Sequence, residues 1–363
     1  MTPSVLAETH LSYFHRGGDV PLLGTTIPER FTQIVKKYPD HDAIVSCHQG
    51  RRLSYRELDL AIDLAAEALF AFGFGRGDRI GVWSTDNIEW LILQMATARI
   101  GAILVNINPA YRPRELEYAL QTSEVQGLFT IPAYSHSNYP EMLINLIPEL
   151  KQHDGVVQSE TFPHLSRVVL FDSVNPMQTE IPAKGFLSWQ DFLDFGREVD
   201  RAVLDEATHA LDCDDPINIQ YTSGTTGFPK AVVLTHHNIL NNAYFTAQAM
   251  KFGPTDRLCV PVPFYHCFGM VLSNLLCLAV GACIVVPAEH FDPLAVLQAI
   301  ESERCTALHG VPTMFIGELE HARFDEFDLS SLRTGIMAGA PCPSELMKRV
   351  INDMHCREIL IGY

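Results

Sequence analysis

The chain has 363 residues, of which 47% are hydrophobic and 19% are charged, an ordinary composition for a soluble globular protein. Because this length exceeds what a single hydrophobic core usually supports, we expect two lobes. The formal net charge of −17, with no run of Lys or Arg, argues against a nucleic-acid-binding surface.

The first part of the chain alternates apolar patterns of helical and strand period. Ser54 and Glu57 have the spacing of a capping box, which predicts that a helix begins there, and Gly73 ends it. Strands that alternate with helices indicate an α/β architecture with a largely parallel sheet. The expected elements are a helix at 28–37, strands at 43–45 and around Leu53, a helix from Ser54 to Phe72, a strand at 80–83, a helix from Asp86, a strand at 102–107, a helix from Pro113 and a strand at 125–130.

The second part of the chain contains an uncharged stretch, residues 258–288, that raises the question of a membrane span. Pro261, Pro263, Gly269 and Gly281 interrupt it, and each continuous piece is too short to cross a bilayer, so we expect no span. The expected elements are helices at 141–151 and 189–195, strands at 168–171, 217–221 and 231–235, a helix capped by Asn238, an extended piece at 258–264, a buried helix at 269–280, a buried strand at 282–287, a helix at 292–303, and strands at 306–309 and 358–363.

The last expected strand, at 358–363, reaches the final residue without a polar tail. A natural terminus rarely leaves an apolar strand this abruptly. We therefore expect the sequence to lack a C-terminal part.

The nine cysteines and the first 26 residues bear on the compartment. The number of cysteines is odd, no C-x-x-C occurs, and most of them lie inside apolar runs, so we interpret them as reduced and buried. Residues 1–26 contain no apolar segment typical of a signal peptide and little Arg. These features predict a cytoplasmic protein.

A polar loop at 222–230 joins the two expected strands at 217–221 and 231–235. Its glycines allow backbone N–H groups to approach an anion, its hydroxyl residues add donors, and Lys230 adds a positive charge. It is not a Walker A motif, because no Gly-Lys-Ser/Thr follows the second glycine. The composition indicates a phosphate-binding loop; the alternative is a polar hairpin turn without a ligand.

The run TSGTTGFPK at these positions resembles the signature of the adenylate-forming superfamily, which includes acyl-CoA synthetases, luciferases and peptide-synthetase adenylation domains. The resemblance implies that the loop holds the β- and γ-phosphates of ATP while a carboxylate attacks the α-phosphorus. Ala231 departs from the family's usual Gly. The implied nucleotide-binding residues are Thr222, Ser223, Gly224, Thr225, Thr226, Gly227, Phe228, Pro229 and Lys230, with catalytic roles for Thr222 and Lys230.

Residues 263–269 match a second stretch of the acyl-CoA synthetases, where aromatic and His residues line the acyl pocket. The implied pocket residues are Phe264, His266 and Gly269; alternatively, His266 is a histidine satisfied within the core. Amino-acid-activating members place an Asp here, whereas this chain has no acidic residue between Arg257 and Glu289. Because a buried ammonium would stay unpaired, we expect a carboxylic acid without an α-amine.

Two further stretches fit the nucleotide end of such a site. Residues 335–341 end in Gly339, Ala340 and Pro341, and in the family this turn borders adenine and ribose. Gly362 and Tyr363 align with the start of the family's Tyr-Gly-x-Thr-Glu, in which the Tyr stacks on adenine. A plain strand-to-helix turn is the alternative for 335–341. His236 is either near the nucleotide or a polar contact at a helix start.

Taken over nearly the whole chain, the resemblance is strongest to the medium-chain fatty-acid–CoA ligase branch. It implies the large N-terminal domain of an adenylate-forming enzyme, with two packed αβ lobes in αβαβα layers, approximately 76–240 and 28–75 plus 241–363, and without the C-terminal catalytic domain. The implied reaction uses ATP, Mg²⁺ and coenzyme A to convert a fatty acid through acyl-AMP to acyl-CoA. We assign no metal ligand within the chain and leave a homodimer possible.

Three other functions stay open at this point. The chain could be an inactive nucleotide- or acyl-binding fragment, because the catalytic residues of the C-terminal domain are absent. An aryl-acid–CoA ligase or a luciferase-like member of the same superfamily would show the same motifs, since pocket dimensions cannot be read from a sequence.

Overall fold

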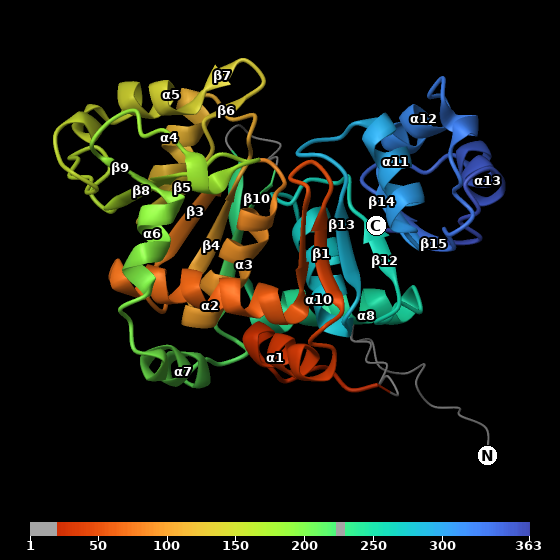
Figure 1. Cartoon of the computed structure of the whole chain (residues 1–363), viewed down its shortest axis with the longest axis horizontal. Coiled ribbons are helices and arrows are strands. Elements are labelled where there is room, and N and C mark those ends of the chain that lie inside the picture. The colour runs from red at the N-terminus through yellow and green to blue at the C-terminus, as the bar shows by residue number, and fades with distance from the viewer. Residues whose placement is uncertain (1–19, 223–228) are drawn as a thin grey trace, which may run out of the picture.

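The computed structural model describes residues 20–222 and 229–363, which form two seven-stranded sheets with helices around and between them (Figure 1). Sheet A has the strand order β16-β15-β14-β12-β13-β1-β2, and sheet B has the order β11-β10-β4-β3-β5-β8-β9. The strands of sheet A are β1 (Asp42–Ser46), β2 (Arg51–Ser54), β12 (Arg257–Cys259), β13 (Cys283–Val286), β14 (Ala307–Gly310), β15 (Thr334–Met337) and β16 (Glu358–Ile361). Those of sheet B are β3 (Arg79–Trp83), β4 (Ile103–Ile107), β5 (Gly127–Thr130), β8 (Arg167–Leu170), β9 (Phe186–Ser188), β10 (Pro216–Thr222) and β11 (Lys230–Thr235).

Each large sheet is parallel except at one edge, where β2 pairs antiparallel with β1 and β11 pairs antiparallel with β10. The prediction of a largely parallel α/β architecture is therefore confirmed. A small third sheet joins β6 (Ala133–Tyr134) to β7 (Ser137–Asn138). Every strand of sheet B lies within 76–240, and every strand of sheet A lies within 28–75 or 241–363. The division into lobes itself stays a prediction.

The helices form three layers around the two sheets (Figure 1). Figure 1 shows α3 between the two sheets, and every residue of α3 and of α10 is buried. Figure 1 shows α11–α13 beyond sheet A at one end of the molecule and α4–α6 beyond sheet B at the other. The helices are α1 (Ile27–Lys37), α2 (Tyr55–Ala71), α3 (Ile88–Ile100), α4 (Pro113–Thr122), α5 (Tyr139–Leu146), α6 (Trp189–Gly196), α7 (Arg201–His209), α8 (His236–Ala249), α9 (Cys267–Gly269), α10 (Leu276–Val280), α11 (Pro293–Glu303), α12 (Pro312–Leu319) and α13 (Ser344–Asn352), with short helical turns η1 (Pro148–Lys151), η2 (Pro176–Gln178), η3 (Met270–Leu275) and η4 (Phe324–Glu326).

Local sequence signals predicted most of the expected helices and strands at the positions where the structure has them. The capping box at Ser54 and Glu57 begins α2 as predicted, and its two reciprocal hydrogen bonds are formed. The prediction that Asn238 caps the next helix is wrong, because Thr235 is the N-cap of α8 and Asn238 is its capping-box partner at the third position. The helix expected at 141–151 is interrupted at Pro148, since proline lacks a backbone N–H and disfavours helical geometry in the residue before it.

Several elements were not expected from the sequence: β9, α7, α12, β15 and α13. The expected helix at 269–280 is present, but its first half is the π-helical turn η3, which runs directly into α10. In the part of the chain that the structure describes, no helix is long and apolar enough to cross a membrane.

All nine cysteines are free, as expected for reduced thiols, but not all of them are buried. Five lie in the core: Cys259, Cys277, Cys283, Cys305 and Cys356. Cys47 and Cys267 are exposed, which corrects the expectation of uniform burial.

Candidate functional site

A cavity of about 950 Å³ opens at the carboxyl-end edge of sheet A. Strands β15 and β16 are parallel neighbours, with Met337 opposite Ile361, so the segments that follow them leave the sheet at the same edge. Ligands of α/β proteins commonly bind at this edge. The cavity walls come from the end of β15 and residues 338–342, from residues 360–363, from residues 266–268 with Leu272, and from α8.

Six residues predicted from three separate stretches meet in this cavity. His266 lines it, as do Gly339, Ala340 and Pro341 after β15, and Gly362 and Tyr363 after β16. Sequence positions almost a hundred residues apart are therefore brought together by the parallel pairing of β15 with β16 and by the start of α9. The structure favours the pocket interpretation of His266 over a histidine closed in the core, since its ring is exposed at the cavity wall.

Small residues shape the wall near β15 and β16. Gly339 has φ +81°, a left-handed conformation that side-chain-bearing residues rarely adopt. A Cβ at Gly362 would lie 3.0 Å from Ile336 Cγ2 and 3.1 Å from Ala338 Cβ, closer than ordinary packing. Gly362 thus lets its segment lie close to the end of β15, and Gly339 allows the chain to turn after β15.

His266 is held by its position at the start of α9. Its Nδ1 accepts a hydrogen bond from the backbone N–H of Phe268 at 3.2 Å, which fixes the ring at the helix N-terminus. Burial of part of the ring lowers the pKa of His266 below its ordinary value, so the imidazole is neutral at pH 7. No Asp, Glu, Lys or Arg side chain occurs among the described residues that line the cavity. The wall therefore suits an uncharged ligand portion and offers no partner for an ammonium.

Phe264 and Gly269 do not line the cavity, which corrects their assignment as pocket residues. Phe264 is fully buried and packs edge-to-face against Trp90, with ring centroids 5.6 Å apart. A Cβ at Gly269 would lie 2.2 Å from the carbonyl oxygen of Pro263, so glycine is required for the chain to fold back at this turn. Both residues support the segment that carries His266.

The β10–β11 hairpin carries the described ends of the loop that the sequence predicts to bind phosphate. Thr222 pairs with Lys230 across the hairpin, both are exposed, and Pro229 is half-buried. The side chain of Lys230 has no hydrogen bond or ion pair with any residue that the structure describes, so its charge is available to a ligand. None of these three residues lines the 950 Å³ cavity. The remaining predicted loop residues, Ser223, Gly224, Thr225, Thr226, Gly227 and Phe228, lie outside the described residues.

His236, at the base of the hairpin, is a polar contact at a helix start. Its Nδ1 accepts the backbone N–H of Ile27 at 3.2 Å, and the ring is fully buried. Burial lowers the pKa of His236 to about 4, a shift that nearby Asp215 only partly offsets. The residue is thus a neutral link between α8 and α1.

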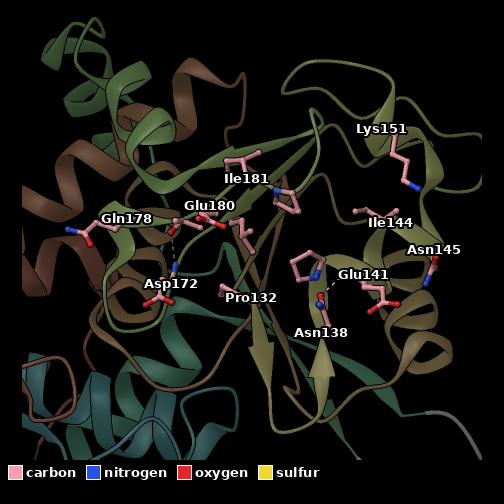
Figure 2. Close-up of a pocket in the computed structure, with 14 residues that line it drawn as sticks. Pro132, Asn138, Glu141, Ile144, Asn145, Lys151, Asp172, Gln178, Glu180 and Ile181 are labelled. Carbon is pink, nitrogen blue, oxygen red and sulfur yellow. Dashed lines mark hydrogen bonds between the residues drawn. The ribbon is translucent and has the colours of Figure 1, made fainter.

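A second cavity, of about 650 Å³, lies at the carboxyl ends of β5 and β8 and is shown in Figure 2. Three acidic residues, Glu141, Asp172 and Glu180, line it together with one cation, Lys151. This charge balance is unfavourable for a polyphosphate. No sequence pattern indicated this cavity, because its walls come mainly from loops and from short elements such as helix α5.

Metal ligands are sparse in the described part of the chain. Its single cluster of three potential ligands is Asp212, Cys213 and Asp214, on an exposed turn before β10. No carboxylate lines the 950 Å³ cavity within the described residues, so these walls do not fit a resident Mg²⁺.

Sequence reasoning missed residues that either line the cavity or hold its wall. Phe245 and Cys342 line it, and no sequence pattern singled them out; Cys267 also lines it and lies in the stretch 263–269, but it was not named as a pocket residue. Asn106 lies in the strand expected at 102–107, for which no site role was predicted, yet its side chain contacts the backbone next to His266. Its signal would have been a polar residue inside an otherwise apolar strand.

Comparison with known proteins gives a consistent picture. Residues 31–363 match the family described as AMP-binding enzyme. The chain is 44% identical over 343 residues to a putative acyl-CoA synthetase, YngI, of Bacillus subtilis, covering 94% of this chain and 61% of the relative. It is 39% identical over 364 residues to the mitochondrial medium-chain acyl-CoA ligase ACSF2 of Danio rerio, covering 99% of this chain and 59% of the relative. The chain thus spans about three fifths of the length of these curated relatives.

Solved structures match over most of the chain. The N-terminal domain of FACL13 from Mycobacterium tuberculosis superposes with a TM-score of 0.74 at 22% identity, covering 94% of this chain and 76% of that one. The anthranilate CoA ligase AuaEII, in complex with anthranoyl-AMP, superposes with a TM-score of 0.76 at 22% identity, covering 95% of this chain and 61% of that one. At this identity the likeness concerns the fold, and it agrees with the expected N-terminal domain of an adenylate-forming enzyme.

Proposed function

We propose that this chain, which belongs to the family of AMP-binding enzymes, is the part of an acid–thiol ligase that binds ATP and a fatty, medium-chain carboxylic acid. The observation that carries the proposal is the meeting of His266, the 339–341 turn and the 362–363 end in one uncharged cavity. Relatives named as acyl-CoA synthetases and medium-chain acyl-CoA ligases support the substrate class.

In the first step the fatty carboxylate attacks the α-phosphorus of MgATP, which is the substrate, and pyrophosphate leaves. Phosphoryl and nucleotidyl transfer needs mainly positioning and charge stabilisation from the protein. Lys230 would stabilise the negative charge that moves onto pyrophosphate, and Thr222 would donate a hydrogen bond beside it. The residues after β15 would border the adenosine, with Tyr363 against the adenine ring.

In the second step the thiol of coenzyme A attacks the acyl carbon of acyl-AMP, and AMP leaves. Neutral His266 and the apolar cavity wall would bound the acyl chain. The absence of charged side chains along the described wall supports an acid without an amine, because a charged ligand end would have no counter-ion there.

The first experiment uses the 363-residue chain and asks for binding. We expect AMP and a sulfamoyl-linked octanoyl-adenylate analogue to bind with measurable heat in isothermal titration calorimetry, and the analogue to bind more tightly than AMP. Failure of both ligands to bind would contradict the nucleotide-binding assignment.

The second experiment asks for chemistry. A chimera continues the chain into the C-terminal part of the Bacillus subtilis relative, and ATP–pyrophosphate exchange is measured against straight-chain acids of different length and against benzoate and anthranilate. Exchange supported best by acids of intermediate length is the expected result. Preference for the aryl acids would replace the fatty substrate with an aromatic one.

A further inference from the structure

Two buried side chains, one in the loop after β3 and one on β4, form hydrogen bonds with the backbone of the segment just before His266. Asp86, in the loop after β3, accepts the backbone N–H of Phe264 through Oδ1 at 2.7 Å. Asn106, on β4, donates from Nδ2 to the carbonyl oxygen of Tyr265 at 3.0 Å and more weakly to that of Phe264 at 3.4 Å. Asp86 is 3% exposed and Asn106 is 2% exposed, so neither bond competes with bulk water.

Further hydrogen bonds connect these residues to β10, the first strand of the β10–β11 hairpin. Asn218, on β10, donates from Nδ2 to Asn106 Oδ1 at 2.8 Å and to the carbonyl oxygen of Leu104 at 2.9 Å. Gln220, on the same face of β10, lies 3.6 Å through its Nε2 from Met270 Sδ. One line of hydrogen bonds therefore runs from the hairpin strand through Asn218 and Asn106 to the backbone beside His266.

The segment that receives these bonds needs outside partners. Phe264 and Tyr265 lie between β12 and α9, in neither a strand nor a helix, and the short helix α9 runs directly into the π-helical turn η3. Apolar packing alone fixes such a segment poorly, whereas directional hydrogen bonds define where its peptide groups lie. Buried polar side chains are costly unless they are bonded. Asp86, Asn106 and Asn218 each make at least one hydrogen bond, although Asn218 Oδ1 has no partner among the described residues, and this set of bonds indicates a specific positional role.

We propose that Asp86, Asn106 and Asn218 are positioning residues that fix the His266 wall of the cavity relative to the β10–β11 hairpin. The proposal rests on the proposed function, since it takes the His266 wall to face the acyl portion of the ligand. The line acts on the acyl end more than on the nucleotide end, because its last contact is beside His266 and none of its bonds reaches residues 338–342 or 360–363.

The test compares two ligands in the 363-residue chain: AMP, and the sulfamoyl-linked octanoyl-adenylate analogue. Asn106→Ala is expected to weaken binding of the analogue about tenfold, equivalent to about 1.4 kcal/mol, and to leave AMP binding within about twofold. Asn218→Ala leaves the contact of Asn106 with Tyr265 in place. It is expected to lower the ratio of the analogue affinity to the AMP affinity about threefold. The double variant should match Asn106→Ala alone, because Asn218 acts through Asn106.

Asn241→Ala is the matched control. Asn241 is also a buried amide with three hydrogen bonds, to Leu23 N–H, to the Leu23 carbonyl and to the His237 carbonyl, but it does not touch residues 264–266. It should lower the thermal midpoint as Asn106→Ala does, without changing the ratio of the two affinities. Asp86→Asn keeps a side-chain oxygen for the Phe264 N–H and should retain wild-type binding, whereas Asp86→Ala should not.

The outcomes separate the two proposals. A wild-type chain that binds neither ligand overturns the proposed function and the positioning role with it. A wild-type chain that binds both, with Asn106→Ala or Asn218→Ala weakening both ligands equally or neither, overturns the positioning role alone. If Asn106→Ala does not fold, the affinity ratio of Asn218→Ala decides.

Discussion

The β10–β11 hairpin and the segment from Phe264 to Val280 both carry polar groups, and the structure treats those groups in opposite ways. At the hairpin, Thr222 and Lys230 are exposed, and the side chain of Lys230 has no partner among the described residues. In the second segment, Ser273 and Asn274 are fully buried, and each has a side-chain partner on another element. The exposed hairpin side chains suit the proposed contact with a ligand, whereas the bonded side chains of the second segment hold the cavity wall in place. Residue type decides the first role, whereas tertiary contacts decide the second.

Replacement of Lys230 should give the largest effect on activity and almost none on stability. Loss of a donor aimed at charge that develops in the transition state costs about 3–4 kcal/mol of barrier, so Lys230→Ala should lower ATP–pyrophosphate exchange in the chimera roughly 10²–10³-fold. Because the side chain is exposed, the unfolding free energy should change by less than about 0.5 kcal/mol.

The control for this prediction is Lys348→Ala, which removes an exposed lysine on α13 whose partner is Glu345. It should leave exchange unchanged. An exchange rate in Lys230→Ala equal to that of the control would remove the hairpin from the chemistry.

His236, at the base of the hairpin, is buried like the polar residues of the second segment, and this burial should make the unfolding free energy depend on pH. His236 has a pKa of about 4 in the folded chain against an ordinary 6.5, so the unfolded state binds the proton more readily between these values. Stability is thus retained above about pH 6.5 and lost as pH falls towards 4. At 1.36 kcal/mol per pKa unit, this histidine should account for about 3 kcal/mol of the loss.

The measurement is the unfolding free energy in urea at pH 7 and at pH 4 for the wild type and His236→Asn. Asn can still accept the Ile27 N–H, and the variant should lose about 3 kcal/mol less than the wild type across this interval. His237→Asn, which replaces the half-buried neighbour on α8, is the control. Equal losses in the wild type and in His236→Asn would show that His236 is hydrated in solution.

Substitution of Gly269 tests the tight turn that supports His266. An added methyl group would lie 2.2 Å from the Pro263 carbonyl oxygen and 2.9 Å from Phe264 Cα, and both are backbone atoms that cannot rotate away. Gly269→Ala should therefore destabilise the chain by about 1–3 kcal/mol, although alanine is intrinsically better in a helix. Gly253→Ala, where nothing lies within 4 Å of the added group, should be near neutral. Equal unfolding free energies for the two variants would mean that the turn is looser than described.

The same contrast explains how much the sequence could predict. Helix starts such as Ser54 are local signals, and the β10–β11 hairpin is formed by consecutive residues, so both could be predicted without knowing the fold; the phosphate-binding role of the hairpin stays a prediction. The meeting of His266 with Gly339 and Tyr363 could be expected only through the family resemblance, because it depends on the pairing of β15 with β16.

The supports of the His266 wall could not be predicted at all. Asp86 bonds a backbone group 178 positions away, and Asn106 one that is 159 positions away. A polar residue in an apolar strand is expected to need a hydrogen-bond partner, but the sequence does not identify that partner. The assignment of Phe264 to the pocket failed for the same reason, because an aromatic residue beside His266 can face either the cavity or Trp90, and it packs against Trp90.

The smallest expected effect belongs to the outer face of the hairpin. Val233, on the edge strand β11, is 55% exposed. Val233→Thr keeps the β-branched shape that suits a strand and removes apolar surface that is already in contact with water, so the unfolding free energy in urea should change by less than about 0.5 kcal/mol. The buried Val82 on β3 is the matched control, since Val82→Thr places an unpaired hydroxyl in the core and should cost about 1–3 kcal/mol. A cost at Val233 as large as that at Val82 would mean that this face is covered in solution, by another part of the protein or by a second copy. The hairpin would then share the buried character of the His266 segment, and the contrast between the two regions would be confined to Thr222 and Lys230.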